Sequence, residues 1–212
     1  MKGKLVVIEG ADASGKKTQS RLLVESLRSA GKSVELVSFP RYNEFFGGLI
    51  KEYLQGKFGS KEQLPVEFVS LLYSLDRFQA KPMLEKWLAE GKIVVCDRFS
   101  ASNIAHQAAK LSGARQKQFI RWLSNVESEL PKPDLTIYLD VPVEFSQSLM
   151  QKEGRKKDLH ESDAAYLEKA RVVYLQLARQ QNWVKIDCVK NRQLLSIAQI
   201  HSLIWKKLFR YL

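Results

Sequence analysis

Cysteine and long apolar runs are both scarce in this sequence. Its 212 residues include two cysteines, Cys96 and Cys188, and each lies at the end of an apolar run, where a buried reduced thiol is the usual occupant. Their positions match no metal-binding spacing, and no segment is long and apolar enough to span a bilayer. The apolar run from Leu5 is short and continues into a glycine-rich loop, unlike a signal peptide. We therefore expect a cytoplasmic protein with no membrane partner.

Acidic residues are fewer than basic ones. The chain has 23 Asp and Glu against 34 Lys and Arg, a net charge of +11, which indicates an anionic ligand such as a nucleotide or a nucleic acid. No recognisable nucleic-acid-binding module is present, so no nucleic-acid partner is expected. The length suits a single domain over residues 1–212.

A strand followed by a phosphate-binding loop is the strongest local pattern. Leu5 to Ile8 form a continuous apolar run, as in a strand buried on both faces. Gly10 and Gly15 then precede Lys16 in a G-x-x-x-x-G-K frame, whose backbone N–H groups converge on phosphate oxygens while the lysine reaches the outer phosphates. A helix is predicted directly after the loop, and its positive dipole end would face the same anion.

The position after the loop lysine departs from this motif. A Ser or Thr that holds Mg²⁺ is usual there, but the chain has Lys17, and Thr18 follows one place later. Lys17 is either a solvated lysine at the helix start or an extra phosphate contact. The loop alone therefore does not identify the metal ligand.

Alternating strand and helix patterns predict an α/β fold. The first strand, helix and strand form the βαβ unit of a parallel sheet. Further strands are predicted at 33–39, 92–96, 134–140 and 183–188, and helices at 47–56, 65–90, 102–110, 163–180 and 194–212. Pro82 is expected to kink or split the long helix that starts at Pro65.

Charged side chains follow several of the predicted strands. Ligands bind at the carboxyl ends of parallel strands, so these side chains would lie beside the phosphate loop. Asp97 and Arg98 suit a metal-water contact and a phosphate clamp, with a plain surface ion pair as the alternative. Arg41, after the second strand, would open onto the same crevice. Asp140 either supports the metal or only ends its strand.

Basic residues are concentrated at 151–158. Lys152, Arg155, Lys156 and Lys157 surround a glycine there, which suits either a solvated face or a lid segment, residues 151–161, that closes over a triphosphate. His106 lies on a predicted helix, where a lone histidine is usually structural, and it receives no proton-transfer role.

Several ordered motifs make the sequence similar to the thymidylate kinase family. They are the phosphate loop with an acidic residue inside it, FPRY, LLYSLDRF, DRFSASNIAHQ, PDLTIYLDVP and GRKKDLHE. The resemblance runs nearly end to end. It implies a P-loop NTPase fold with a five-stranded parallel sheet, helices on both faces and a short basic lid. It further implies a homodimer that transfers the γ-phosphoryl group of ATP, bound with Mg²⁺, to dTMP, giving dTDP and ADP.

The resemblance also implies roles for individual residues. The implied catalytic residues are Lys16, Asp12, Arg98 and Arg155, and Asp12 joins Asp97 as a candidate Mg²⁺ ligand. The implied ATP-binding residues are Gly10, Ala11, Asp12, Ala13, Ser14, Gly15, Lys16, Lys17 and Thr18. The implied dTMP-binding residues are Asp12, Phe39, Arg41, Tyr42, Tyr73, Arg77, Arg98, Ser102 and Asn103. Among these, Tyr73 matches the aromatic that stacks on thymine, and Arg77 matches the arginine that recognises the base.

The sequence departs from the family pattern in places besides Lys17. His106 stands where several members have a tyrosine that excludes the ribose 2′-hydroxyl, and Phe99 replaces a tyrosine or histidine. The loop has Ala13 and Ser14 where some members carry a catalytic arginine, so the resemblance assigns that role to Arg155. The alternatives are a kinase of the same fold acting on dUMP, UMP or a deoxynucleoside, and a non-catalytic P-loop protein that binds nucleic acid.

Overall fold

A five-stranded parallel sheet forms the centre of the computed structural model, which describes residues 2–59, 64–152, 163–209 and 211. The strand order is β2-β3-β1-β4-β5, and every neighbouring pair is parallel. The strands are β1 (Lys4–Gly10), β2 (Val34–Ser38), β3 (Ile93–Asp97), β4 (Leu135–Asp140) and β5 (Trp183–Asp187). The predicted α/β fold with five parallel strands is confirmed.

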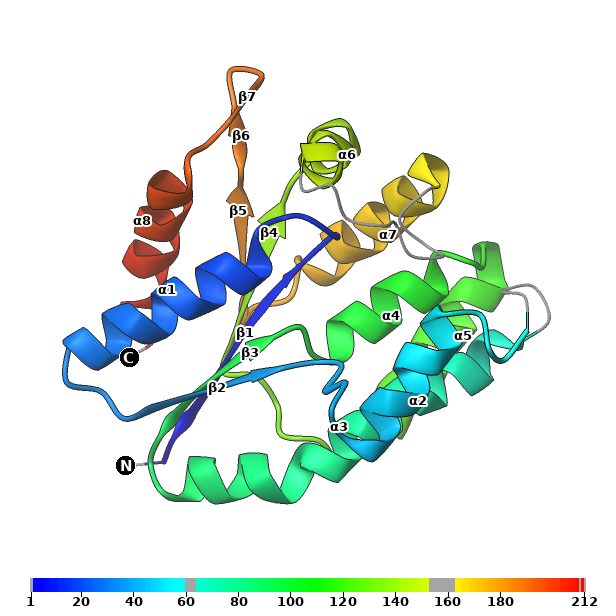
Figure 1. Ribbon diagram of the computed structural model, residues 1–212, viewed down its shortest axis with the longest axis horizontal. Helices are drawn as coiled ribbons and strands as arrows, with labels where there is room; N and C mark the ends of the chain where they lie inside the picture. The colour runs from blue at the N-terminus through cyan, green and yellow to red at the C-terminus, as the bar shows by residue number, and fades with distance from the viewer. Residues whose placement is uncertain (1, 60–63, 153–162, 210, 212) are drawn as a thin grey trace.

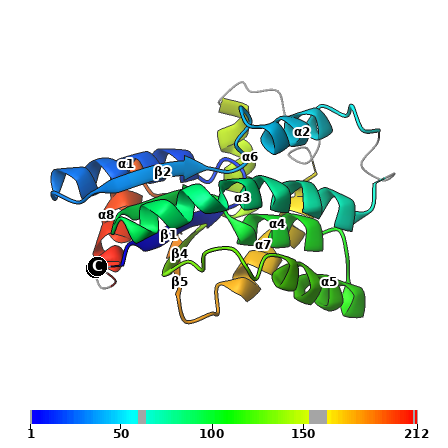
Figure 2. The same cartoon turned by 90° about the horizontal axis from the view of Figure 1, so that it is seen from below.

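Helices cover both faces of this sheet (Figures 1 and 2). They are α1 (Lys16–Ser29), α2 (Phe45–Leu54), α3 (Val66–Ala89), α4 (Ser100–Ala108), α5 (Gly113–Val126), α6 (Val143–Lys152), α7 (Ala164–Leu177) and α8 (Ile197–Leu208). The side chains of α1 and α8 pack on one face, while α3, α4, α5 and α7 contribute to the packing on the other. None of the helices within the described ranges is both long and apolar enough to cross a membrane.

The central strand β1 is buried on both faces, as its continuous apolar run predicts. Val6 and Ile8 belong to the cluster that includes α1 and α8 side chains, whereas Leu5 and Val7 belong to the cluster that includes α3. This alternation follows from the two-residue repeat of a strand. The phosphate loop therefore begins from a strand that is held rigidly from both sides.

The expected split of the long helix at Pro82 is wrong, and the expected kink stays a prediction. Helix α3 runs without a break from Val66 to Ala89 and contains Pro82. Ala80 and Leu84, on either side of the proline, are fully buried against the sheet. Packing of this kind supplies most of the stability of a helix in a protein, and here it outweighs the loss of one backbone donor.

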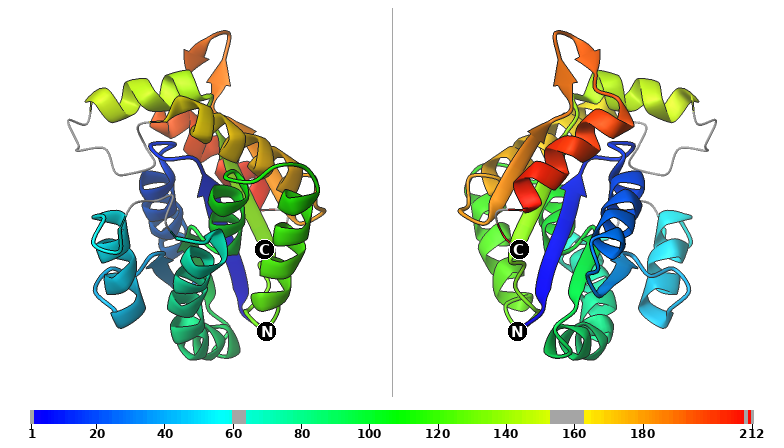
Figure 3. Two further views of the ribbon diagram at one scale, coloured as in Figure 1. Left: turned by 90° about the vertical axis from the view of Figure 1, so that its right-hand side faces the viewer. Right: turned by 90° about the vertical axis from the view of Figure 1, so that its left-hand side faces the viewer.

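Other segments also differ from the prediction. Helices α5 and α6 were not predicted; in α5 only Phe119 and Leu123 are buried, and the sequence before Phe119 is mainly polar. Helix α8 begins at Ile197 rather than at 194, since Ser196 and Gln199 form a capping box at its start. The residues before it form a hairpin of β6 (Val189–Lys190) and β7 (Gln193–Leu194), which projects beyond the end of the main sheet (Figure 3).

Candidate active site

The loop after Gly10 joins β1 to α1 at the carboxyl edge of the sheet. A Cβ atom at Gly10 would lie 2.6 Å from Ser14 Oγ and 2.9 Å from the Leu139 carbonyl oxygen, so no side chain fits there. Ala13 and Gly15 have positive φ angles of 55° and 82°, as in the backbone turns that direct N–H groups toward a shared anion. The first turn of α1 carries no acidic side chain, and its positive end is available to a phosphate.

Lys16 is almost fully buried at the start of α1. Its Nζ donates to the carbonyl oxygen of Ala11 and, at 3.3 Å, to Ser14 Oγ. Burial and the charge of Arg98 lower the pKa of Lys16 to about 8, against the opposing effect of Asp12. Lys16 is therefore mostly protonated at neutral pH, and its charge is held inside the loop.

The predictions for Lys17 and for the lid segment stay predictions. Lys17 and Thr18 are both exposed at the start of α1, which suits either interpretation of Lys17. Residues 153–161 of the predicted lid, including Arg155, lie outside the described residues.

Arg98 follows β3 and connects the phosphate loop to α4. Its φ angle is 66°, a strained conformation for a residue with a side chain and one that is concentrated at functional sites. The guanidinium donates to the Gly10 carbonyl oxygen at 3.2 Å, to Ser102 Oγ at 3.0 Å and to a carboxylate oxygen of Asp12. Although burial opposes the charged form, Asp12 and other acidic groups raise the pKa of Arg98. Among the described residues Arg98 pairs with Asp12 rather than with Asp97.

Glu9 is a buried carboxylate beside Arg98 that was not among the predicted site residues. Its Oε1 accepts the backbone N–H groups of Phe99 at 2.9 Å and Ser102 at 3.2 Å, and its Oε2 accepts Ser102 Oγ at 2.6 Å. Burial raises the pKa of Glu9 in spite of these hydrogen bonds. Phe99, the N-cap residue of α4, has no capping side chain, so Glu9 caps that helix from β1. In the sequence, the one local feature that could have indicated Glu9 is the presence of an acidic residue in an otherwise apolar strand.

A pocket adjoins the phosphate loop. It contains about 600 Å³ of empty space, including its open mouth. Its lining residues are Asp12, Phe39, Pro40, Tyr42, Leu54, Tyr73, Arg77, Arg98, Phe99, Ser102, Asn103, His106 and Gln107. The fold thus brings together all the predicted dTMP-binding residues except Arg41.

Arg41 is held by α3 instead. Its backbone N–H and its Nε donate to the two carboxylate oxygens of Asp76 at 2.9 and 3.0 Å, and its Nη2 donates to the Asp76 carbonyl oxygen at 3.0 Å. The Asp76 side chain is 1% exposed. Arg41 is not among the residues that line the pocket, but its guanidinium lies 5.9 Å from the centroid of the Phe39 ring, and it anchors the loop after β2.

A buried polar cluster joins α3, α4 and the end of α5 beside the pocket. Glu127 Oε1 accepts hydrogen bonds from Ser74 Oγ at 2.6 Å, from Asn103 Nδ2 at 2.9 Å and from Arg77 Nη2. Burial alone would raise the pKa of Glu127, but the charge of Arg77 and hydrogen bonds from Arg77, Ser100 and Ser74 lower it overall. Glu127 was not predicted, because it follows a helix that the sequence pattern did not indicate.

His106 lines the same pocket as a neutral ring. Its Nδ1 lies 3.2 Å from the Tyr166 hydroxyl, which donates to the His106 carbonyl oxygen at 2.9 Å. Burial lowers the pKa of His106 to about 4, with only partial compensation from Asp12. His106 is therefore uncharged at physiological pH.

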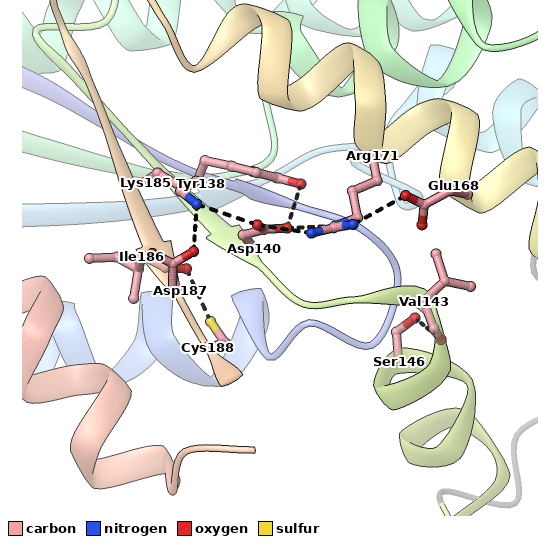
Figure 4. Close-up of polar contacts among 10 residues, drawn as sticks. All are labelled: Tyr138, Asp140, Val143, Ser146, Glu168, Arg171, Lys185, Ile186, Asp187 and Cys188. Atoms are coloured by element: carbon pink, nitrogen blue, oxygen red, sulfur yellow. Dashed lines mark hydrogen bonds and ion pairs between the residues drawn. The ribbon is translucent and has the colours of Figure 1, made fainter. Parts of the chain in front are cut away.

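Asp140, at the end of β4, is surrounded by cations (Figure 4). Arg171 donates to its two oxygens from Nε at 2.7 Å and from Nη2 at 3.2 Å, and Lys185 Nζ lies 3.7 Å from Oδ2. Both carboxylate oxygens are thus engaged by α7 and β5. This arrangement favours a structural role for Asp140 over support of a metal.

Asp97, at the end of β3, offers a contrasting carboxylate. It is 9% exposed, and its Oδ1 has no hydrogen-bond partner in the part of the chain that the structure describes. A buried oxygen of this kind is costly unless a ligand completes it. Mg²⁺ usually takes one or two carboxylates together with substrate phosphates and waters. The donor chemistry therefore fits Mg²⁺ brought by a nucleotide, and the described residues hold no three-residue His, Cys, Asp or Glu cluster for a metal.

Similar proteins share one description. The family model described as thymidylate kinase matches residues 8–200. Human thymidylate kinase is 32% identical over 203 residues, which cover 95% of this chain and 87% of the human one. Thymidylate kinase of Mycobacterium tuberculosis (strain H37Rv) is 33% identical over 185 residues, which cover 83% of this chain and 86% of its own. A solved structure of thymidylate kinase from Candida albicans matches with a TM-score of 0.83 and 26% identity, covering 99% of this chain and 92% of that one.

Proposed function

This chain belongs to the thymidylate kinase family, and on that premise we propose how its pocket phosphorylates dTMP. The enzyme transfers the γ-phosphoryl group of ATP to dTMP and releases dTDP and ADP. A phosphate oxygen of dTMP bonds to the γ-phosphorus, and the bond to the β,γ-bridging oxygen breaks, its electron pair leaving with ADP. One observation carries the residue assignment: Asp12 belongs to the phosphate loop and also lines the pocket that contains the predicted dTMP-binding residues.

The phosphate loop, residues 10–18, is the proposed ATP site. Its N–H groups bind the β- and γ-phosphates, and Lys16 Nζ exchanges its bonds to the loop for bonds to the γ-phosphate oxygens. The transition state of phosphoryl transfer spreads negative charge over the equatorial oxygens, so charges fixed beforehand stabilise it more than the ground state. The burial of Lys16 strengthens this effect, because little water screens its charge.

Arg98 is the proposed ligand of the dTMP phosphate. Its bonds to the phosphate loop and to Ser102 hold the guanidinium in place before substrate binds, so little rotamer freedom is lost on binding. Asp12, paired with Arg98, is assigned to the sugar 3′-hydroxyl. Tyr73 is assigned to stacking on thymine, and Phe39 and Tyr42 to the surroundings of the dTMP phosphate.

Mg²⁺ is the proposed cofactor, with Asp97 as its first candidate ligand and Asp12 as the second. When bound, the metal neutralises charge on the phosphates during transfer. The unpartnered Oδ1 of Asp97 supports this assignment. Arg155 is the proposed arginine of the transition state, because its planar fork can bridge two phosphoryl oxygens.

A homodimer formed through α3 is a further part of the proposal. Phe68, Leu71 and Leu75 follow one another at helical spacing and are 44%, 40% and 40% exposed. An apolar stripe of this kind on a helix is typical of a protein interface.

One continuous sheet with helices on both faces supports a single domain over residues 1–212. The free, buried Cys96 and Cys188 support a cytoplasmic location.

An ADP-release assay with Mg-ATP and separate acceptors tests the function. We expect turnover with dTMP to exceed turnover with dUMP, UMP, dCMP and thymidine by at least about tenfold, as for a site that reads hydrogen-bonding groups. Preference for another acceptor would assign the enzyme to that acceptor. No turnover from a folded protein that binds ATP would favour the nucleic-acid-binding alternative, which a salt-dependent shift with single-stranded DNA then tests.

A further inference from the structure

Glu127 accepts hydrogen bonds from two side chains of the pocket. Arg77 and Asn103 line the pocket, whereas Glu127 does not. Each of the two is tied to Glu127 Oε1 through one nitrogen. Each also keeps one buried polar atom that has no partner among the described residues, Nε in Arg77 and Oδ1 in Asn103. Because both side chains line the pocket, a ligand bound there is the candidate partner of these two atoms.

The orientation of the Asn103 amide follows from its partners. Its Nδ2 lies 3.0 Å from the Ser70 carbonyl oxygen and 2.9 Å from Glu127 Oε1. A carbonyl oxygen and an ionised carboxylate can only accept hydrogen bonds, so the amide must turn its NH₂ group toward them. Oδ1, which only accepts, is left without a partner among the described residues.

The resulting pattern distinguishes two kinds of pyrimidine. Arg77 can only donate, and Asn103 Oδ1 can only accept. Thymine and uracil offer an O4 acceptor beside an N3–H donor, which complements this pair. Cytosine offers an amino donor beside an N3 acceptor, so both of its groups would meet groups of the same polarity, and such a mismatch is strongly rejected when it is buried.

We propose that Glu127 is a positioning residue that fixes this polarity and thereby selects 4-oxopyrimidine over 4-aminopyrimidine nucleotides. The inference rests on the proposed function, in which this pocket binds the base of dTMP. Glu127 acts through Arg77 and Asn103 and touches no substrate. Its buried negative charge keeps both side chains in the donor and acceptor orientations that the thymine edge requires.

Steady-state kinetics of Glu127→Gln with dTMP and dCMP test this role. Glutamine keeps the volume of the side chain but removes its charge and can offer an NH₂ group to Asn103, which lets that amide turn over. We expect KM for dTMP to rise at least about tenfold. The ratio of kcat/KM for dTMP to kcat/KM for dCMP, which measures the preference, should fall at least about tenfold. We expect kcat with dTMP and KM for ATP to change less than about threefold.

Glu127→Asp separates polarity from packing. Aspartate keeps the acceptor-only carboxylate but shortens the side chain, so the preference should stay within about threefold of the natural one even where KM rises. If the role of Glu127 is purely structural, Glu127→Gln should keep the natural preference better than Glu127→Asp, because glutamine matches the volume of glutamate more closely. Asp140→Asn is the matched control, since it makes the same carboxylate-to-amide change in the ion pair with Arg171, and it should leave the preference unchanged.

The outcomes distinguish this inference from the function on which it depends. If the natural enzyme does not phosphorylate dTMP, the proposed function fails first. If it does, and Glu127→Gln keeps the natural preference, the role of Glu127 is overturned. If Glu127→Gln does not fold, Glu127→Asp decides, because it keeps the acceptor-only carboxylate. A preference for dTMP over dCMP within about threefold of the natural one then supports the inference, and a larger loss of that preference overturns it.

Discussion

The two ends of the pocket are built in different ways. At the phosphate end, the binding groups come from short segments that directly follow β1 and β3, and backbone N–H groups take a large part. At the base end, the polar groups come from three helices, and Arg77 and Glu127 are 50 residues apart in the chain. The phosphate end can therefore serve any nucleotide, whereas selection of the base depends on tertiary packing. Substitutions at the first end should lower kcat, and those at the second should raise KM.

The largest effect is expected for Lys16→Met. Methionine keeps much of the buried stem but removes the charge that faces the transferring phosphoryl group. We expect kcat to fall at least about 10³-fold with a change in KM for dTMP below about threefold, measured by coupled ADP release. Lys117→Met, at an exposed position on α5, is the control. A kcat within about tenfold of the natural value would remove Lys16 from the transition state.

Arg155→Ala tests whether the phosphate end extends into the predicted lid. Loss of a charge made available only in the transition state should lower kcat by at least about 10²-fold and leave dTMP affinity nearly unchanged. Lys157→Ala should have a smaller effect, because lysine is a point charge without a bidentate fork. An unchanged kcat for Arg155→Ala would exclude it from the mechanism and leave Lys16 and Arg98 as the main cations.

Tyr73→Ala should affect the base end alone. Loss of stacking on thymine is expected to raise KM for dTMP by about tenfold and to change kcat less than about threefold. Tyr73→Phe keeps the ring and should stay close to the natural enzyme. If KM for dTMP is unaltered in Tyr73→Ala, the side chain only packs against α2. That result would contradict the assignment of KM to the base end of the pocket.

A last effect, on stability rather than on kinetics, concerns His106, which also lines the pocket. The folded-state pKa of His106 is about 4, below its ordinary value of 6.5, so the unfolded chain binds the proton first as pH falls. Stability is therefore fully present above pH 6.5 and is lost as pH falls toward 4, by about 2 kcal/mol at pH 5. Urea unfolding at pH 7.5 and 5.0 should show this loss, and His106→Gln should reduce it. Equal losses in both proteins would show that His106 is not the group responsible.

The features that sequence alone could predict are those carried by contiguous residues. The apolar run of β1, the glycines around Lys16 and the charged residues after β3 each form a local pattern, and the fold brings them to one edge. Pro82 misled, because its effect on α3 is decided by the burial of its neighbours against the sheet. Glu9, Asp76 and Glu127 were missed for the same reason. Nothing in the sequence beside each of these acidic residues indicates its partners, and its function comes from side chains that only the tertiary fold brings to it.

The clamp of Asp76 on Arg41 has a kinetic consequence. Three hydrogen bonds hold the loop after β2 against α3, and the same loop supplies Phe39, Pro40 and Tyr42 to the pocket wall. The proposed dTMP pocket is therefore assembled when the protein folds. Association of dTMP needs no ordering of that loop, and its rate constant should follow diffusional encounter and electrostatic attraction rather than rearrangement.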